Sequence, residues 1–232
     1  MNILAADTST PIMNLALVTD NGYTCFSLED GMHHSENLVP AIIELLKKRN
    51  LTLKDLDLLA CTAGPGSFTG LRIAMSALKG ISTATSTPLV SVKTMDLLAS
   101  FTSFYPGLRV VAIDARKKRF YVALYREDKR LCPDLDCHES EVIEMLQGED
   151  HVLITGPDAT LFSTKLVEAG IKDIRLDIDN SPKNIALQLA KLAVVQFNEK
   201  GADAIGSGPV YVRKSDAEIA LEKRIQALRE EK

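Results

Sequence analysis

Tryptophan is absent from the 232 residues, and aromatic residues of all kinds make up only 5%. Few rings are therefore available to stack on unpaired bases, as proteins that bind single-stranded nucleic acid require. Basic residues are also in deficit, because 27 Lys and Arg face 31 Asp and Glu, giving a formal net charge of −4. A protein whose main task is to grip phosphate backbones is expected to be basic. The composition therefore disfavours autonomous nucleic-acid binding.

Cysteine is sparse, and long hydrophobic runs are missing. The four cysteines, at positions 25, 61, 132 and 137, are too few and too scattered for a disulfide framework. No basic region precedes the apolar start, which argues against a signal peptide. The longest uncharged stretches, 58–71 and 80–92, are interrupted by Gly, Pro, Ser and Thr and fall short of the ~20 apolar residues that span a membrane. We expect a cytoplasmic protein with free thiols and no membrane partner.

The hydrophobic pattern predicts an α/β protein with two related halves. Strands are expected over 3–6, 13–18, 23–28, 56–62 and 89–92, with helices over 35–49, 71–86 and 94–103. The pattern then restarts: strands over 109–113, 120–125 and 151–154, helices over 139–146, 159–169 and 184–198, and an irregular stretch over 132–137. Hairpins followed by alternating helices and strands indicate mixed sheets flanked by helices.

The boundary between the halves is expected near 104–107, where Pro and Gly interrupt the pattern. We predict an N-terminal lobe over 1–104, completed by a C-terminal helix over 216–232, and a smaller second lobe over 105–215. Pro40 fits the first turn of its helix if Asn37 is the N-cap, because the first helical N–H groups have no intrahelical partner. A cap at Ser35 would instead make Pro40 a kink.

A glycine-rich segment, Gly64-Pro65-Gly66-Ser67-Phe68-Thr69-Gly70, joins a predicted strand to a predicted helix. Glycines in this position let the backbone approach a ligand, and the helix N-terminus favours an anion. The segment lacks the Lys-Ser/Thr ending of a P-loop and the spacing of G-x-G-x-x-G. The pattern therefore favours a tight turn before a well-capped helix over phosphate binding.

Acidic residues end the first strand of each half. Asp7 opens the stretch Asp7-Thr8-Ser9-Thr10, and Asp114 occupies the matching place in the second half. Two such residues would fit a nucleotide cleft between lobes, whereas the alternative is a turn held by its own side chains. The candidate nucleotide contacts, vestigial or at an interface, are Asp7, Thr8, Ser9, Thr10, Gly64, Gly66, Ser67, Thr69, Gly70, Arg72 and Asp114.

Patterns typical of metal sites and of serine hydrolases are missing. Metal-binding histidines on a helix face stand four residues apart, whereas His33 and His34 are adjacent. The Cys132, Cys137 and His138 spacing does not match C-x-x-C, and no G-x-S-x-G elbow is present. We therefore predict no metal site and find no support for a serine hydrolase.

The span 109–130 contains eight Lys or Arg and three acidic residues, a local net charge of +5. This basic island is the candidate place for an RNA contact, although a solvated hairpin explains it equally well. The candidate residues are Arg116, Lys117, Lys118 and Arg119.

The helices over 35–49 and 71–86 carry more apolar surface than one core requires. The second of them is apolar on two sides, and such a helix is usually covered on both. We therefore predict a protein–protein interface. Its candidate residues are Leu38, Ile42, Leu45, Leu71, Ile73, Met75, Ala77, Leu78, Ile81 and Ala84.

Several motifs occur in order along nearly the whole chain. They are the stretch 3–10, His34-Ser35-Glu36-x-Leu38-x-Pro40, the stretch 64–72, Asp114-Ala115-Arg116, Phe120-Tyr121-x-Ala123 and Pro209-x-Tyr211-x-Arg213. Together they resemble the TsaB (YeaZ) family, accessory subunits of the bacterial machinery that makes N6-threonylcarbamoyladenosine in tRNA. One departure is Ala74, where the family usually has Gly.

The resemblance implies a two-lobed, ribonuclease H-like fold of the actin, hsp70 and sugar-kinase type. It further implies a non-catalytic paralogue that binds and activates TsaD, with the ATPase TsaE joining the complex and tRNA reached through it. Alone, such a subunit is expected to form a homodimer. TsaD-type proteins carry a His-x-x-x-His pair that holds a metal. This chain lacks that pair, which agrees with a lost metal site. No cofactor is expected of this chain itself, and ATP or ADP at the interface with the partner stays open.

Two other functions remain open at this point. An ATP-dependent kinase or metallopeptidase of the same superfamily would use Asp7, Asp114 and the Gly64 segment. A direct tRNA-binding module would use the basic island instead.

Overall fold

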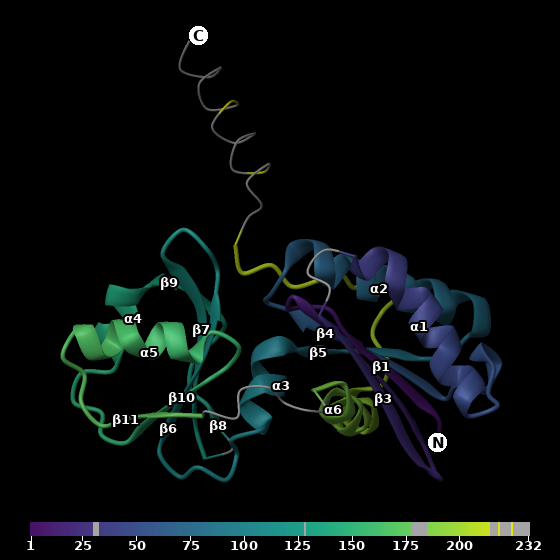
Figure 1. Ribbon diagram of the computed structural model, residues 1–232, viewed down its shortest axis with the longest axis horizontal. Coiled ribbons are helices and arrows are strands. Elements are labelled where there is room, and N and C mark those ends of the chain that lie inside the picture. The colour runs from purple at the N-terminus through teal and green to yellow at the C-terminus, as the bar shows by residue number, and fades with distance from the viewer. Residues whose placement is uncertain (30–32, 128, 178–184, 214–217, 219–223, 225–232) are drawn as a thin grey trace.

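The computed structural model describes residues 1–29, 33–127, 129–177 and 185–213, together with residues 218 and 224. These residues form two β-sheets, each flanked by helices, that stand side by side (Figure 1). The mixed α/β class predicted from the sequence is confirmed. The helix predicted over 216–232 lies outside the described residues, apart from 218 and 224.

The first sheet has the strand order β3-β2-β1-β4-β5. Its strands are β1 (Ile3–Asp7), β2 (Ile12–Thr19), β3 (Gly22–Glu29), β4 (Leu58–Gly64) and β5 (Leu89–Lys93). The hairpin strands β2 and β3 run antiparallel, whereas β4 lies parallel to both β1 and β5. Every residue of β1 and β4 is buried. Helices cover both faces of the sheet, which is why these two strands read as continuous apolar runs.

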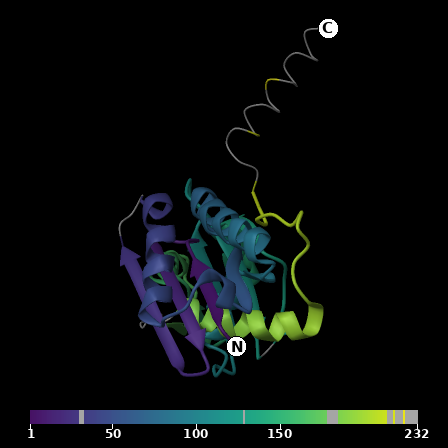
Figure 2. The same ribbon diagram turned by 90° about the vertical axis from the view of Figure 1, so that its right-hand side faces the viewer.

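Helices pack on both faces of the first sheet (Figure 2). One face is covered by α1 (His34–Lys48) and α2 (Phe68–Thr85), with the short 3-10 helix η1 (Leu53–Asp55) between them in sequence. The other face is covered by α6 (Ile185–Lys200) and α3 (Thr94–Ser100). Two separate clusters of buried residues result, one on each side of the sheet.

The second sheet has the order β11-β10-β6-β7-β8, with β9 also paired to β7. Its strands are β6 (Leu108–Asp114), β7 (Arg119–Arg126), β8 (Lys129–Arg130), β9 (Leu135–His138), β10 (Val152–Thr155) and β11 (Ile174–Leu176). Helices α4 (Glu139–Met145) and α5 (Ala159–Glu168) pack on one face through a third buried cluster. Residues of the other face join α3 and α6 in the cluster they share with the first sheet.

The two sheets repeat one pairing pattern. A central strand, β1 or β6, lies antiparallel to the next strand and parallel to a later one, β4 or β10. Each later strand leads into a Gly-Pro pair, and Gly64 and Gly156 have nearly equal φ angles of +111° and +110°. The topology therefore agrees with the prediction of one architecture used twice, and it places Asp7 and Asp114 at equivalent strand ends.

Neither Asn37 nor Ser35 is the N-cap of α1. The helix begins at His34 with His33 as N-cap, so Pro40 lies inside it rather than in its first turn. His34 fixes this early start because its ring is buried and its Nε2 lies 3.1 Å from the carbonyl oxygen of Thr10. Pro40 itself is exposed, so the missing N–H is tolerated beside solvent.

Two further expectations need correction. The stretch 132–137 is not irregular throughout, because Leu135–His138 pairs with β7 as β9. Residues 105–215 do not all belong to the second lobe, because α6 packs against β1, β2 and β5. The chain thus returns to the first sheet after completing the second. In the described ranges, no helix has the length and apolar character needed to cross a membrane.

Candidate functional site

Asp7, at the carboxyl end of β1, is fully buried. Its Oδ1 accepts hydrogen bonds from Thr62 Oγ1 at 2.8 Å and from the backbone N–H of Ser9 at 3.1 Å. Its Oδ2 is buried and makes no hydrogen bond among the described residues. Burial raises the pKa of the Asp7 carboxyl, and the hydrogen bonds and the nearby His34 oppose that rise. Burial therefore disfavours the charged form of Asp7, and its carboxyl group is enclosed by the protein.

The glycines that begin α2 lie against the turn that follows Asp7. The Ser67 N–H donates to the carbonyl oxygen of Ser9 at 2.8 Å, and Thr8 Oγ1 donates to the carbonyl oxygen of Gly70 at 2.7 Å. A Cβ on Gly66 would lie 2.7 Å from the Ser9 oxygen, and one on Gly70 would collide with the Thr8 carbonyl. Close packing of the chain on itself therefore explains both glycines. Ser67 caps α2 by accepting from the Gly70 N–H at 3.2 Å, as the turn interpretation expects.

Gly64 is covered from another direction, by residues 201–213, which we call the strap. The Val210 N–H donates to the carbonyl oxygen of Ala63 at 2.7 Å. A Cβ on Gly64 would lie 2.6 Å from the carbonyl oxygen of Val210. The motif Pro209-x-Tyr211-x-Arg213 drew attention to this segment, but sequence reasoning did not place it against Gly64.

Arg72, a candidate nucleotide contact, is engaged by the strap instead. The rings of Phe68 and Tyr211 stack with centroids 4.7 Å apart and an interplanar angle of 10°. Arg72 Nε donates to the Tyr211 hydroxyl at 2.7 Å, and the guanidinium lies 5.3 Å from the Tyr211 ring centroid. The remaining candidates differ: Thr69 is exposed in the first turn of α2, whereas half-buried Thr10 donates to the carbonyl oxygen of Ile12 at 3.1 Å.

Asp114 ends β6 as Asp7 ends β1, but its surroundings differ. Its Oδ1 accepts from the backbone N–H of Arg116 at 2.7 Å, and its Oδ2 lies 3.5 Å from Arg116 Nη1. The Asp114 N–H donates to Asp158 Oδ2 at 2.7 Å, and partial burial raises the pKa of Asp158. Asp114 is thus part of the turn that begins the basic hairpin.

Much of the basic island is neutralised within the chain. Ion pairs join Arg116 to Asp114, Arg119 to Asp136, Arg126 to Glu149, and Arg130 to Asp96 and Asp134. Arg109 is buried and donates to the carbonyl oxygen of Ala99 at 2.8 Å. Lys117 and Lys118 are exposed at the tip of the β6–β7 hairpin. These acidic partners therefore leave much less positive charge available to RNA than the local net charge of +5 indicates.

The predicted interface residues divide into two groups. Six lie on the sides of α1 and α2 that face the first sheet, so they are buried and cannot touch a partner directly: Leu38, Ile42, Leu45, Leu71, Met75 and Leu78. Ile73, Ala77 and Ile81 are half-buried, and Ala84 is exposed. The candidate residues did not include Val39 and Ile43 on α1, which are 47% and 43% exposed. Their i, i+4 spacing outside the buried stripe was the available signal.

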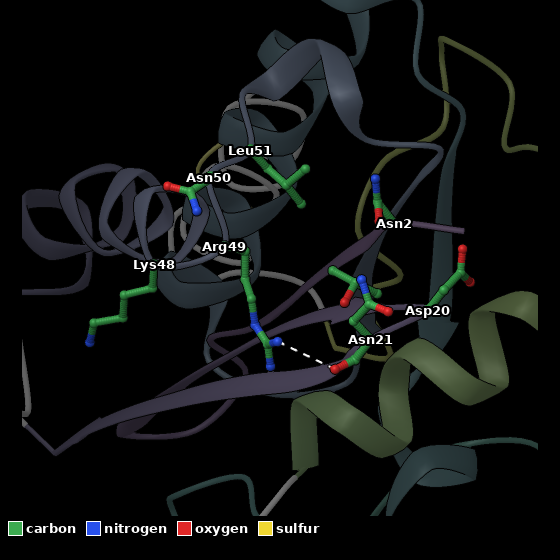
Figure 3. Close-up of a pocket in the computed structure, with 8 residues that line it drawn as sticks. Asn2, Asp20, Asn21, Lys48, Arg49, Asn50 and Leu51 are labelled. Carbon is green, nitrogen blue, oxygen red and sulfur yellow. Dashed lines mark hydrogen bonds between the residues drawn. The ribbon is translucent and has the colours of Figure 1, made fainter.

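A shallow polar pocket of about 350 Å³ lies at the amino end of β1, beside the C-terminal end of α1 (Figure 3). Arg49 enters it and donates from Nη2 to the carbonyl oxygen of Tyr23 at 2.7 Å and from Nη1 to that of Asn21 at 3.5 Å. Asp20 is paired with the N-terminal amine at 2.6 Å. Both charged groups are satisfied by the chain itself. Within the described ranges, no cluster of three or more His, Cys, Asp or Glu is arranged to hold a metal ion.

Comparison with known proteins gives consistent matches. The family model described as TsaD, tRNA N6-adenosine threonylcarbamoyltransferase, matches residues 30–143. The tRNA threonylcarbamoyladenosine biosynthesis protein TsaB of Bacillus subtilis is 28% identical over 226 residues, covering 94% of this chain and 96% of the relative. An uncharacterized protein of Mycobacterium bovis is 32% identical over 223 residues, 93% of each chain. The solved structure of YeaZ from Pseudomonas aeruginosa superposes with a TM-score of 0.76 at 24% identity, covering 90% of this chain and 99% of that one.

Proposed function

The chain belongs to the TsaB (YeaZ) family and so has a role in tRNA threonylcarbamoyladenosine biosynthesis, and from this premise we propose that it is a non-catalytic subunit that binds TsaD and holds it in its active state. The proposed contact surface is the outer face of α1 and α2. We call it the α1–α2 face and define it by Val39, Ile43, Ile73, Ala77, Gly80, Ile81 and Ala84.

The observation that carries the proposal is Gly80, in the middle of α2. A Cβ built there meets nothing within 4 Å, so packing inside this chain does not require a glycine. Glycine in a helix interior costs about 0.5–1 kcal/mol relative to alanine. A partner that approaches the helix backbone closely would account for that cost.

The neighbours of Gly80 make a continuous stripe. Ile73, Ala77, Gly80 and Ala84 follow one another at intervals of three or four residues, so they share one side of α2. Val39 and Ile43 extend the apolar surface onto α1, which packs beside α2 (Figure 2). Small residues at the centre with larger apolar residues beside them suit the packing of a partner helix.

The non-catalytic role is supported by the condition of the superfamily's usual ligand region. Asp7 is fully buried. The space beside the glycines of the 64–70 segment is occupied by the turn after β1 and by the strap. The match of residues 30–143 to the TsaD family model fits a paralogue that retains the fold. On this proposal TsaE and tRNA join through the complex. The chain needs no cofactor of its own, and ATP or ADP, where present, lies at the interface with TsaD. Alone, the chain pairs with a second copy through the same face.

The binding proposal is tested by co-purification with TsaD. Ala84→Glu places a charge on an exposed position, so the variant keeps its fold and loses TsaD, because an unpaired charge would be buried in the interface. Ala77→Glu tests the half-buried centre of the stripe. Thr164→Glu, at an exposed position on α5, is the control and retains TsaD. Unchanged binding by both α2 variants would exclude this surface.

The activation proposal needs a separate measurement. TsaD, TsaE, threonylcarbamoyl-adenylate and tRNA are combined with and without this chain, and the modified nucleoside is quantified. We expect the product to depend on the chain and to drop with Ala84→Glu. Equal product without the chain contradicts an activating role.

A further inference from the structure

We propose that residues 209–213 form a clasp that joins the two lobes across the carboxyl ends of their central strands. This inference does not depend on TsaD binding. It rests on the contacts that the strap makes at either end, first with α2 and β4 and then with the β6–β7 turn and β9. In Figure 1 the strap, drawn in yellow, runs from α2 to the region between the two lobes.

The strap is held firmly on the first lobe before it reaches the clasp. Asp203 Oδ2 accepts from Ser91 Oγ at 2.5 Å and from the Ser91 N–H at 2.8 Å. Lys79 of α2 donates to the carbonyl oxygens of Ile205 and Ser207. The Asp203 carboxylate and the Lys79 ammonium group thus fix residues 203–207 on the first lobe. Their position sets the path of the residues that follow.

The first-lobe end of the clasp combines a backbone and an aromatic contact. The Val210 N–H donates to the carbonyl oxygen of Ala63 near the carboxyl end of β4, and the Val210 carbonyl lies against Gly64. Tyr211 then stacks on Phe68 and accepts a hydrogen bond from Arg72. Charge-assisted hydrogen bonds and aromatic stacking each contribute more than an ordinary surface contact.

The second-lobe end consists of Val212 and Arg213. Val212 packs against the buried cluster that both sheets share, as does Ala115 of the β6–β7 turn. Arg213 Nη1 donates to the carbonyl oxygen of Ala115 at 3.4 Å, and its Nε lies 4.0 Å from Asp136 Oδ2. Asp136 is held at the same time by Arg119 Nε at 2.8 Å. Arg213 therefore completes a three-residue charge cluster on the far lobe.

The clasp lies where ligands bind in many related architectures. Ligands of open α/β sheets bind in the crevice outside the carboxyl ends of the strands. Here that path is crossed by the protein's own backbone, from Gly64 at the end of β4 to Ala115 directly after β6. The Arg213 contacts are long, at 3.4 Å and 4.0 Å, whereas Val210 and Tyr211 make hydrogen bonds of 2.7 Å on the first lobe, so the second-lobe end is the end that releases. The clasp thus acts as a releasable latch on lobe separation.

The test measures the distance between lobes in the isolated full-length chain. Spin labels are attached to Glu44→Cys on α1 and Thr164→Cys on α5, both exposed, with Cys25 and Cys132 changed to Ser. Labelled chain is diluted with unlabelled chain so that only distances within one molecule are measured. We expect a narrow distribution in the parent, a broader one with Arg213→Ala, and a further broadening with Tyr211→Ala added. Arg126→Ala, which removes an ion pair within the second lobe, is the control and leaves the distribution narrow.

A second readout separates release of the clasp from general loosening. Amide hydrogen exchange at Val210 should accelerate in Arg213→Ala, whereas exchange in β1 and β4 stays slow. Arg213→Lys keeps the charge and is expected to restore most of the protection. Unchanged distance distributions in the double variant, or broadening equal to that of Arg126→Ala, overturn the proposal. Because TsaD is absent from these measurements, their failure would leave the proposed binding function standing.

Discussion

At the scale of single residues, two glycines in one helix have opposite roles. Gly70, in the first turn of α2, is needed because the Thr8 carbonyl occupies the place of a side chain. Gly80, ten positions later, faces open space. The sequence places Gly70 directly before the helix predicted over 71–86 and Gly80 inside it, but it does not show what either glycine contacts. What separates them is a contact with a residue about sixty positions away, which no local pattern contains.

This difference predicts opposite effects of one substitution. Gly70→Ala should destabilise the chain by about 1–3 kcal/mol, because the methyl group forces backbone from Thr8 or α2 to move. Gly80→Ala should stabilise it by about 0.5–1 kcal/mol, because alanine is the better helix former and nothing obstructs its methyl group. Urea denaturation of both variants measures the two free energies of unfolding. Changes of the same sign would contradict the packing described for α2.

Asp7 predicts an unusual pH dependence of stability. Its pKa is raised by burial in the folded chain, so the folded chain binds the proton more tightly than the unfolded chain does. The stabilisation from this proton is fully present below the unfolded pKa of about 3.9 and is lost as the pH rises through the folded pKa. Asn cannot ionise but retains an acceptor for Thr62. The free energy of unfolding of the parent minus that of Asp7→Asn should therefore fall as pH rises from 4 to 8, and parallel profiles would show that Asp7 is not desolvated.

At the scale of secondary-structure elements, α2 is both a core helix and a surface helix. Its buried side carries Leu71, Met75 and Leu78, and the opposite stripe contains Ala77 and Gly80. The apolar count of the sequence indicated apolar residues on two sides of the helix, and in this chain only one of these sides is fully buried. It did not indicate which residues face inward, because the register of α2 on β4 is set by packing with α1 and β5.

The α2 stripe predicts that stability and binding can be separated. Gly80→Leu should leave the isolated chain at least as stable as the parent, yet weaken TsaD binding by tenfold or more, because a leucine side chain prevents close approach of the partner. Calorimetric titration of TsaD with each purified variant measures the binding constant. Thr83→Leu, at an exposed position of α2 outside the stripe, is the control, and equal affinities for both variants would place the contact elsewhere.

Most elements were predictable because their signals are local. The Asn21-Gly22 hairpin, the apolar strand before Gly64 and the amphipathic α1 and α5 all follow from spacing and turn residues. The spacing left the N-cap of α1 open between Ser35 and Asn37, and it could not show that the helix begins at His34, because His34 is buried by a contact with Thr10. The strand β9 was missed because a four-residue edge strand depends on its partner β7 for recognition.

At the scale of the whole molecule, the candidate site depends on contacts between distant segments. The sequence correctly suggested that Asp7 and Asp114 end equivalent strands. It could not show that the strap covers Gly64, because that contact joins residues about 145 positions apart. The return of α6 to the first sheet could not be predicted either, because the amphipathic pattern of a helix does not specify which sheet it will cover.

The distribution of charge over the whole molecule predicts weak affinity for RNA. Four arginines of the basic island are paired with acidic side chains, and Arg109 is buried. At physiological salt the isolated chain should not bind tRNA in a filter-binding assay, and the double substitution Lys117→Ala and Lys118→Ala should change nothing. Tight binding with a steep salt dependence, lost in that variant, would favour a direct RNA contact at the hairpin tip.

The position of α6 in the chain also has a consequence for how the protein is made. A ribosome delivers β1 to β5 first, then the whole second sheet, and only afterwards the helix that covers the inner face of the first sheet. Until residue 200 has emerged, Ala5, Leu58 and Val90 lack the helix that buries them. The nascent N-terminal half must therefore wait, with an apolar sheet face open to chaperones, for the second half to be synthesised.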